Sequence, residues 1–234
     1  MNEATATVIR LPAPVREQVV RILRGAILNG QLAVGRRLTE RELVALVGAS
    51  RTTIREALRQ LEAEGLVKVL PGKGPAVAGV SPAEAAQLYE VRAVLEGLAA
   101  RLFAERANDE TVADLQSAVR NYQQACRRND LSEMLEAKDR LYEVLFRGSG
   151  NEILHGLAVS VNARIRRLRS FSLSQKGRVS QSLQEIRAVL EAIRHRDPDG
   201  AEQLSKKHVH NAARVALDAL EATDPAGQSS RVSK

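Results

Sequence analysis

The chain has 234 residues, a formal net charge of +7 and a single cysteine, and only 3% of its residues are aromatic. One cysteine excludes a disulfide within the chain, and the scarcity of aromatic side chains argues against proteins that bind single-stranded nucleic acid by stacking on its bases. No stretch approaches the ~18 uncharged apolar residues of a membrane span, and the first twelve residues lack the apolar core of a signal peptide. We therefore expect a cytoplasmic protein.

The positive charge is concentrated in the first third of the chain. Residues 15–75 contain eleven Lys and Arg against six Asp and Glu. Such a basic surface on a small domain suits a polyanionic partner, whereas the alternative is ordinary charge that only keeps the surface soluble. The excess coincides with a helix-turn-helix pattern at residues 39–65, which favours the polyanion.

The first predicted helix begins after Pro14, a residue suited to the first turn of a helix, and ends near Asn29-Gly30. Its helical period places six apolar residues on one stripe: Val15, Val19, Ile22, Leu23, Ala26 and Ile27. This stripe predicts that the helix packs against the two helices that follow it in a core of three helices.

Two short helices with a tight turn between them are predicted within residues 39–65. Thr39 and Glu42 have the spacing of a capping box at the start of the first helix, and Gly48 permits the turn after it. Ser50 is placed to cap the second helix, which ends at Gly65.

The second of these helices has the features of a helix that enters DNA. Small hydroxyl and guanidinium side chains gather in the run Ser50-Arg51-Thr52-Thr53, at the helix N-terminus, where backbone N–H groups and the helix dipole favour phosphate. Its apolar residues, Ile54, Leu58 and Leu61, anchor the opposite side. The pattern predicts sequence-directed DNA binding.

A hairpin is predicted directly after this helix. Residues 66–70 alternate like a strand, Pro71-Gly72-Lys73-Gly74 makes a tight turn, and residues 75–80 can return as the partner strand. A hairpin in this position is the wing of a winged helix-turn-helix domain.

From residue 81 onward the sequence predicts only helices. Ser81-Pro82-Ala83-Glu84 combines an N-cap, a proline at the first helical position and a glutamate at the third, and it opens a long helix to about Arg106. Caps or breakers divide residues 108–222 into about five more helices; they are Asn108, Asp130, Ser149-Gly150-Asn151, Ser180 and Asp197-Pro198. A bundle of about six helices is the natural packing, with Cys126 in its core.

The predicted fold is therefore mainly α, with two domains. Residues 11–78 are expected to form a winged helix-turn-helix domain, and residues 79–222 an all-helical bundle. Residues 223–234 are small and polar with Pro and Gly, which predicts a disordered tail.

The run GQLAVGRRLTERELVALVGASRTTIREALRQLEAEGLV closely resembles the winged-helix signature of GntR-family transcription regulators, over about residues 15–75. The segments VRAVLEGLAARLFAERA at 91–107 and DRLYEVLFRGSGNEIL at 139–154 are similar to the helical effector domain of the FadR-type, or FCD, branch. The resemblance implies a sequence-specific DNA-binding transcription regulator, expected to be a repressor. It also implies a homodimer that places two reading heads over a pseudo-palindromic operator in double-stranded DNA.

The resemblance implies a set of DNA-contacting residues in the major groove and, at the wing turn, near the minor groove. The candidates are Arg41, Ser50, Arg51, Thr52, Thr53, Arg55, Arg59, Gly72 and Lys73. Arg51 is the best candidate for reading a base, because a guanidinium pairs bidentately with guanine, whereas Lys73 is expected to contact phosphate only. The alternative for Arg41 and Arg59 is a solvated helix face paired with Glu56 or Glu62.

Many FCD domains bind a divalent metal through one Asp and three His, and the metal, together with an arginine, holds a metabolite that carries a carboxylate. Asp139 and His208 match this pattern, but Glu143 and Ile186 stand where the other two His are usual. The resemblance implies Asp139, Glu143 and His208 as candidate ligands of Zn, Mn or Ni, and the same three with Arg92 as the candidate effector site. The alternative is that Asp139 pairs with a basic side chain and His208 is an ordinary helix residue, which Ile186 favours.

The stretch between Glu152 and Glu185 contains six basic residues and no acidic residue. They are Arg164, Arg166, Arg167, Arg169, Lys176 and Arg178. An arginine from this group that faced inward could bind an anionic effector without a metal, although any single one is also compatible with solvated charge.

Two interpretations of the second domain stay open. In the first, it binds a small organic acid that changes the affinity for DNA. In the second, the protein is a constitutive dimeric regulator whose helical domain only dimerises. An enzyme is not expected, because the sequence shows no nucleophile with its base, no phosphate loop and no complete metal site.

Overall fold

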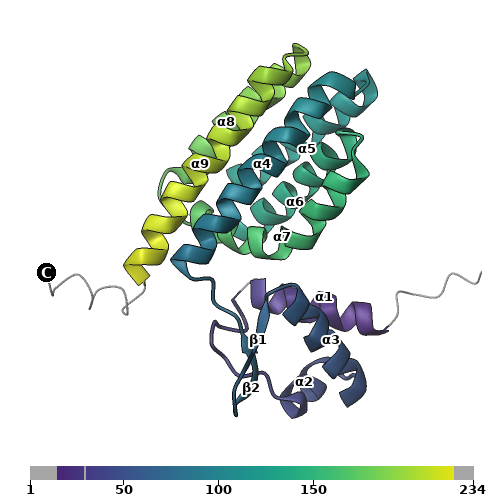
Figure 1. Ribbon diagram of the computed structural model, residues 1–234, viewed down its shortest axis with the longest axis vertical. Coiled ribbons are helices and arrows are strands. Elements are labelled where there is room, and N and C mark those ends of the chain that lie inside the picture. Colours follow the sequence, from purple (N-terminus) through teal and green to yellow (C-terminus); the bar gives the residue numbers. More distant parts are fainter. Residues whose placement is uncertain (1–14, 29, 224–234) are drawn as a thin grey trace, which may run out of the picture. The chain divides into compact units, whose positions relative to one another are not determined.

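The computed structural model describes residues 15–28 and 30–223, without the side chains of residues 162, 163 and 223. The chain divides into two compact units between Gly79 and Val80, and each is considered by itself. The first unit contains the helices α1 (Val15–Leu28), α2 (Glu40–Val47) and α3 (Arg51–Ala63) and the strands β1 (Val67–Leu70) and β2 (Gly74–Val77) (Figure 1). The second contains six helices: α4 (Pro82–Arg106), α5 (Asp109–Arg128), α6 (Leu131–Gly148), α7 (Glu152–Leu173), α8 (Arg178–Arg194) and α9 (Pro198–Thr223).

Helix α1 packs on α3 and confirms the predicted helix, but its apolar stripe is partly wrong. The buried residues are Val19, Val20, Leu23, Ala26, Ile27 and Leu28. Val15 and Ile22, which the period also placed on the stripe, are 62% and 53% exposed. The apolar arc of α1 is wider than the face that α3 covers, so the period alone could not decide which edge of the arc becomes buried.

The caps predicted for α2 and α3 are confirmed. The Thr39 hydroxyl accepts a hydrogen bond from the backbone N–H of Glu42, and the Ser50 hydroxyl accepts one from that of Thr53. Between the helices Gly48 adopts φ +68°, in the left-handed region that glycine enters without steric cost, and its N–H bonds to the Val44 carbonyl. These local bonds set the turn that separates α2 from α3.

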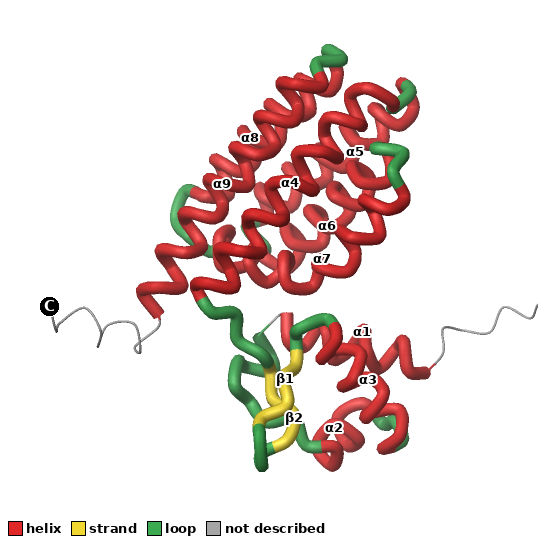
Figure 2. The backbone as a smooth tube through the Cα atoms, in the orientation of Figure 1, coloured by secondary structure: helices red, strands yellow, loops and turns green. Residues whose placement is uncertain are grey.

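The predicted wing is present as an antiparallel pair in which Val67 faces Val77 and Leu70 faces Gly74 (Figure 2). The segment before α2 also joins it, because Arg37 forms an isolated bridge with Ala76 and the N–H of Leu38 donates to the Pro75 carbonyl. This third partner could not be predicted from the sequence, since a single bridge requires no strand pattern.

The second unit is a bundle of the predicted six helices. Four of them begin at the expected caps, Ser81, Asn108, Asp130 and Asn151, whose side chains each accept a backbone N–H of the first turn. The cap predicted at Ser180 is wrong. Helix α8 begins after Gly177, whose carbonyl already accepts the N–H of Gln181, so Ser180 lies inside the helix. The predicted tail, residues 223–234, lies outside the described residues apart from Thr223, which ends α9.

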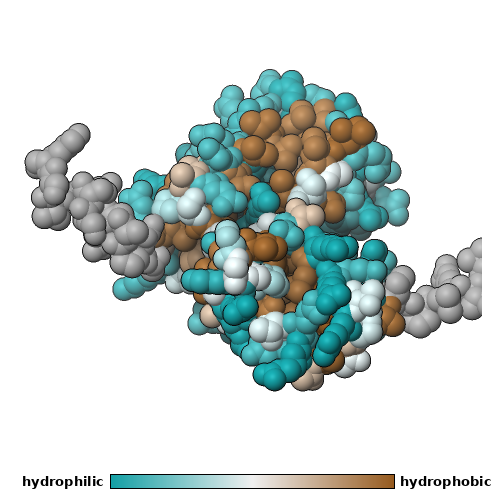
Figure 3. Space-filling model, turned by 60° about the horizontal axis from the view of Figure 1, so that its bottom comes forward, coloured by the Kyte–Doolittle hydropathy of each residue, from teal (hydrophilic) through white to brown (hydrophobic). Residues whose placement is uncertain are grey.

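The core of the bundle is aliphatic with a few buried rings. Phe103 and Tyr122 are fully buried in it, and Cys126 packs against it as expected. A smaller cluster around Tyr89 and Leu168 joins α4, α7 and α9, and α4 lies along α9. Seen from one side, hydrophilic residues cover much of each unit, and apolar residues reach the surface among them in places (Figure 3).

One glycine makes the packing between α4 and α6 testable. A Cβ on Gly148 would lie 2.6 Å from Cδ2 of Phe103 and 2.9 Å from Cγ2 of Thr111, and the Phe103 ring is fully buried. We expect Gly148→Ala to lower the free energy of unfolding by about 1–3 kcal/mol, measured by urea denaturation, because the ring cannot move without strain.

The matched control for this substitution is Gly156→Ala in α7. A Cβ on Gly156 would meet nothing within 4 Å, so this variant should gain about 0.5–1 kcal/mol from helix propensity. Equal shifts of the two variants in the same direction would contradict the packing described here.

Candidate nucleic-acid interface and effector site

Helix α3 has one buried face and one exposed basic face. Ile54, Leu58 and Leu61 are buried in the core of the first unit, as predicted. Arg51 and Thr52 are exposed at the other side of the helix, next to the exposed cap Ser50. The free N–H groups of the first turn and the guanidinium of Arg51 therefore lie at one accessible helix end, where an anion is favoured.

Three of the candidate arginines are available to a ligand. Arg41, Arg51 and Arg59 are exposed, and within the described part of the chain none has a carboxylate within 4.0 Å. The pairing of Arg41 and Arg59 with Glu56 or Glu62, which was the alternative interpretation, is therefore not seen. Their charges face solvent.

Arg55 differs from these three. Its Nε lies 2.5 Å from Oε1 of Glu40 on α2, and the hydrogen bond from Arg55 lowers the pKa of that carboxyl. Both side chains are at the surface, where such a pair contributes little to stability. Arg55 can therefore exchange Glu40 for a phosphate or a base at small cost.

The wing turn presents the remaining candidates. Lys73 is exposed at its tip, beside Gly72, whose φ of +69° the turn requires. Three further exposed basic residues of this unit, Arg36, Arg37 and Lys68, were not among the predicted contacts. The only signal for them in the sequence was the general excess of positive charge.

The second unit contains a group of charged side chains in its interior, which we call the buried charged cluster. Its members are Arg92 and Glu96 of α4, Lys138 and Asp139 of α6, Arg169 of α7, Arg178 and Glu185 of α8, and His208 of α9. Sequence reasoning named Arg92, Asp139 and His208 as site residues, and it placed Arg169 and Arg178 in a group from which some could face inward. It missed Glu96, Lys138 and Glu185, since nothing local distinguishes a buried charge from a solvated one.

Two ion-pair systems organise this cluster. Around Glu96, the Nε of Arg92 lies 2.5 Å from Oε1, and Nη2 of Arg169 lies 3.5 Å from the same oxygen. Arg169 also reaches Asp139 at 3.1 Å, and Arg166 pairs with Asp139 at 2.8 Å. Asp139 therefore pairs with basic side chains, as the alternative interpretation held.

The second system surrounds Glu185. Its Oε2 lies 2.6 Å from Nδ1 of His208 and 2.8 Å from Nη1 of Arg178, and its Oε1 accepts a hydrogen bond from Asn211. Burial alone would raise the pKa of Glu185, but the bonds from His208 and Asn211 and the charge of Arg178 lower it to about 2. Burial and the nearby positive charge of Lys138 lower the pKa of His208 to about 3, so its imidazole is neutral at pH 7.

The predicted metal set of Asp139, Glu143 and His208 is not brought together. Glu143 is turned to Arg147 and to His155, whose Nε2 lies 3.1 Å from its carboxylate, while His208 is turned to Glu185. Among residues 15–28 and 30–223, no three His, Cys, Asp or Glu side chains gather in a group that could hold a metal ion. Each candidate ligand instead has a charged partner on a neighbouring helix: Arg169 for Asp139, His155 for Glu143 and Glu185 for His208.

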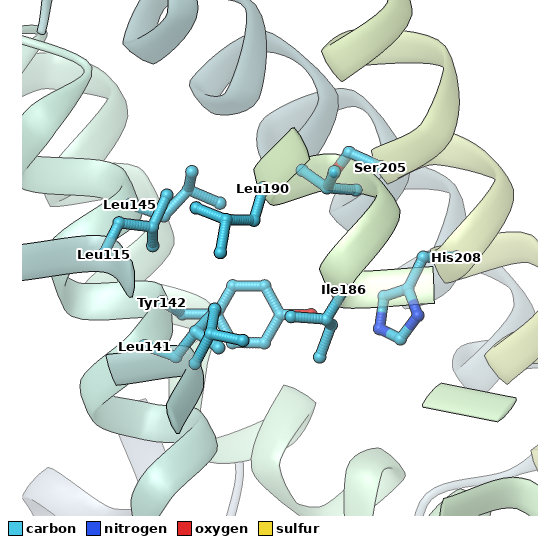
Figure 4. Close-up of a pocket in the computed structure, with 10 residues that line it drawn as sticks. Leu115, Leu141, Tyr142, Leu145, Ile186, Leu190, Ser205 and His208 are labelled. Atoms are coloured by element: carbon cyan, nitrogen blue, oxygen red, sulfur yellow. The ribbon is translucent and has the colours of Figure 1, made fainter. Parts of the chain in front are cut away.

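A small cavity adjoins the buried charged cluster (Figure 4). On one side it is lined by aliphatic residues, among them Leu115, Leu141, Leu145, Ile186 and Leu190. Tyr142, Ser205 and His208 supply its polar lining. Ile186, at the position where the family usually has a His, thus extends the apolar wall instead of supplying a ligand.

Comparisons with known proteins agree with both units. Residues 87–211 match the model of the FCD domain, and residues 15–77 match that of bacterial regulatory proteins of the gntR family. The chain belongs to the gntR family. It is a DNA-binding transcription regulator with an FCD domain, and it is not an enzyme.

Several relatives of this GntR-family regulator align over most of its length. It is 27% identical to the HTH-type transcriptional regulator YdhC of Bacillus subtilis (strain 168), over 86% of this chain and 90% of that protein. It is also 27% identical to the galactonate operon transcriptional repressor of Escherichia coli (strain K12), over 85% of this chain and 95% of that protein. The solved structure of E. coli McbR/YncC has the same fold, with a TM-score of 0.76 at 20% identity, over 88% of this chain and 99% of that one.

None of the described helices is long and apolar enough to cross a membrane.

The protonation of His208 predicts how stability depends on pH. Because its pKa falls from about 6.5 in the unfolded chain to about 3 when folded, the unfolded chain binds more protons between these values, and stability drops as pH decreases below 6.5. Between pH 7 and pH 5 we expect His208 to account for a loss of about 2 kcal/mol in the free energy of unfolding.

The measurement is urea denaturation at both pH values, for the natural protein and for His208→Gln, which keeps a donor for Glu185. The variant should lose about 2 kcal/mol less than the natural protein over the same interval. Parallel losses would show that the imidazole is not held neutral.

Proposed function

We propose that this GntR-family regulator is a repressor that reads an operator through α3 and whose DNA affinity is changed by a small organic anion in its helical unit. The observation that carries the DNA-reading part is the exposed guanidinium of Arg51 at the N-terminus of α3, which has no carboxylate within 4.0 Å among the described residues. Residues 11–78 are the proposed reading domain, and residues 79–222 the proposed sensing and dimerising domain.

The proposed contacts divide into two kinds. Arg51 reads a base edge, since a guanidinium can bond to both acceptors of a guanine, and Arg55 lies one turn further along the same helix. The other proposed contacts position the helix and wing on the phosphate backbone: Arg41, Ser50, Thr52, Thr53, Arg59, Gly72 and Lys73. Only the first kind distinguishes sequences.

A homodimer would supply the sequence specificity that a single DNA-binding domain lacks. A single α3 presents few side chains to the bases, and two heads related by a twofold axis double the number of bases read on a pseudo-palindromic operator. The similarity to a relative that is named a repressor supports repression in preference to activation.

A second candidate function is a constitutive regulator whose helical unit only dimerises. The separate pairings of Asp139, Glu143 and His208 favour it, because no ligand set for the metal that many FCD domains use to hold an effector is assembled among the described residues. The adjoining cavity favours the sensor, since it combines an apolar wall with a few polar groups, as small-molecule sites do.

The reading role of Arg51 is tested with an operator selected from random duplexes by the natural protein. We expect Arg51→Ala to weaken binding to this operator by about 1–3 kcal/mol and to relax the preference at one base position per half-site. Fluorescence anisotropy of labelled duplexes and a repeated selection with the variant measure these two effects.

Lys73→Ala is the matched control, since it removes an exposed cation of the same unit. It should weaken binding to operator and to unrelated duplex alike and reduce the dependence of affinity on salt by about one ion. Unchanged base preference in Arg51→Ala, with circular dichroism and dimer content intact, would refute the proposed contact.

A further inference from the structure

A groove on the surface of the helical unit lies between α5 and α8, outside the buried charged cluster. The two helices are in contact, since the buried hydroxyls of Tyr122 on α5 and Ser182 on α8 lie 3.1 Å apart. The groove has a volume of about 500 Å³, and the buried side chains of Val119 and Leu190 form its apolar base. This volume is within the range of small-molecule sites.

The polar lining of the groove is positively charged. Arg120 of α5 faces Arg187 and Arg194 of α8 across the groove, and Glu191 is the acid among its lining residues. Glu191 pairs with Arg194 at 2.9 Å. Arg120 and Arg187 are exposed, and within the described part of the chain neither has a carboxylate within 4.0 Å. Because their like charges repel, an anion between them would relieve this repulsion.

The same character continues along the facing stripes of both helices. At helical spacing, the stripe of α5 contains Gln116, Arg120, Gln123 and Arg127, and that of α8 contains Gln184, Arg187, Glu191 and Arg194. A surface that only keeps a protein soluble usually intersperses both signs of charge. These two stripes contain four arginines and one acid, so they form a concentrated positive surface along the groove.

The two free guanidinium groups match a phosphate monoester better than a carboxylate. A phosphate monoester has a charge of about −1.5 to −2 at pH 7 and three strong acceptor oxygens, whereas a carboxylate has a single charge and two oxygens. Each guanidinium presents its donors in a planar fork that fits phosphate. Arg120 and Arg187 together can therefore balance the charge of one phosphate group.

The rest of the groove restricts the body of such a ligand. The amides of Gln116 and Gln123 line the groove and make no hydrogen bond to other described residues, so they are available to hydroxyl groups. From Gln116 to Gln123 the groove extends along α5 for about 10 Å, at 1.5 Å per residue. This length suits a small molecule, whereas a stable protein partner would cover about 800 Å² of surface.

We propose that the groove between α5 and α8 binds a small phosphorylated molecule that carries hydroxyl groups. Its phosphate lies between Arg120 and Arg187, and its body lies over the apolar base within reach of Gln116. This site is separate from the interior of the helical unit and does not depend on the organic anion proposed above as an effector.

The test uses the full chain and three probes: ribose 5-phosphate, ribonate and inorganic phosphate. Isothermal titration calorimetry is carried out at about 150 mM salt, which screens the weak attraction between distant exposed charges. We expect ribose 5-phosphate to bind at least about tenfold more tightly than ribonate, because it forms more charge-assisted hydrogen bonds. It should also bind at least about threefold more tightly than inorganic phosphate, since its hydroxyl groups add hydrogen bonds.

Four variants locate the binding. Arg120→Ala and Arg187→Ala should each weaken the binding of ribose 5-phosphate about tenfold or more. Arg140→Ala is the matched control, because it removes an exposed arginine of α6 that does not line the groove, and it should bind as the natural protein does. Gln116→Leu should weaken the binding of ribose 5-phosphate and leave that of inorganic phosphate unchanged. Thermal unfolding of each variant checks that the fold is retained.

Other sites for phosphate are outcomes of the same test. Absence of ribose 5-phosphate binding, tighter binding of ribonate, or equal effects of Arg187→Ala and Arg140→Ala would overturn the inference. Loss of ribose 5-phosphate binding in Arg51→Ala alone would place the phosphate at α3 and would also overturn it. Operator affinity, measured without the probes, should be unchanged in Arg120→Ala and Arg187→Ala, and a loss there would assign the groove to DNA instead.

Discussion

The ion pair between Arg92 and Glu96 is the constraint around which the helical unit is built. Both side chains are at most 2% exposed, and they lie one turn apart on α4. Burial opposes the charge on each, yet the attraction of Glu96 raises the pKa of Arg92, and the attraction of Arg92 and Arg169 lowers that of Glu96. Removing either partner would leave an uncompensated charge in the core. Arg169 of α7, whose Nη2 lies 3.5 Å from Oε1 of Glu96, links this pair to the packing of α7 on α4.

The two units of this GntR-family regulator use positive charge in opposite ways. In the first unit the cations of α3 and the wing are exposed, and exposed cations attract any polyanion, more strongly as its charge increases and less strongly as the salt concentration increases. In the second unit the cations of the buried charged cluster lie in a medium of low dielectric constant, where a charge interacts strongly with the few groups that touch it. The first arrangement suits a long phosphate backbone, and the second suits one small anion.

Much of the fold could be predicted from short stretches of sequence. Thr39, Ser50 and Ser81 cap the helices that their spacing predicted, because a cap is a bond between residues three positions apart. The N-cap predicted at Ser180 failed although its signal was equally local. The chain already enters α8 after Gly177, so Ser180 lies inside the helix. The predicted burial of Val15 and Ile22 on α1 failed for a different reason, because it depends on how much of α1 is covered by α3.

The sequence by itself determined the helices, the wing, the family and the exposed basic residues of α3, because each depends on residues a few positions apart or on a contiguous motif. Only the tertiary structure decided which charges meet. Asp139, Glu143 and His208 fit a family pattern in the sequence, but the structure pairs them with Arg169, His155 and Glu185. The burial of Lys138 was equally beyond the sequence, since a lysine enters a core only where faces of several helices close over it.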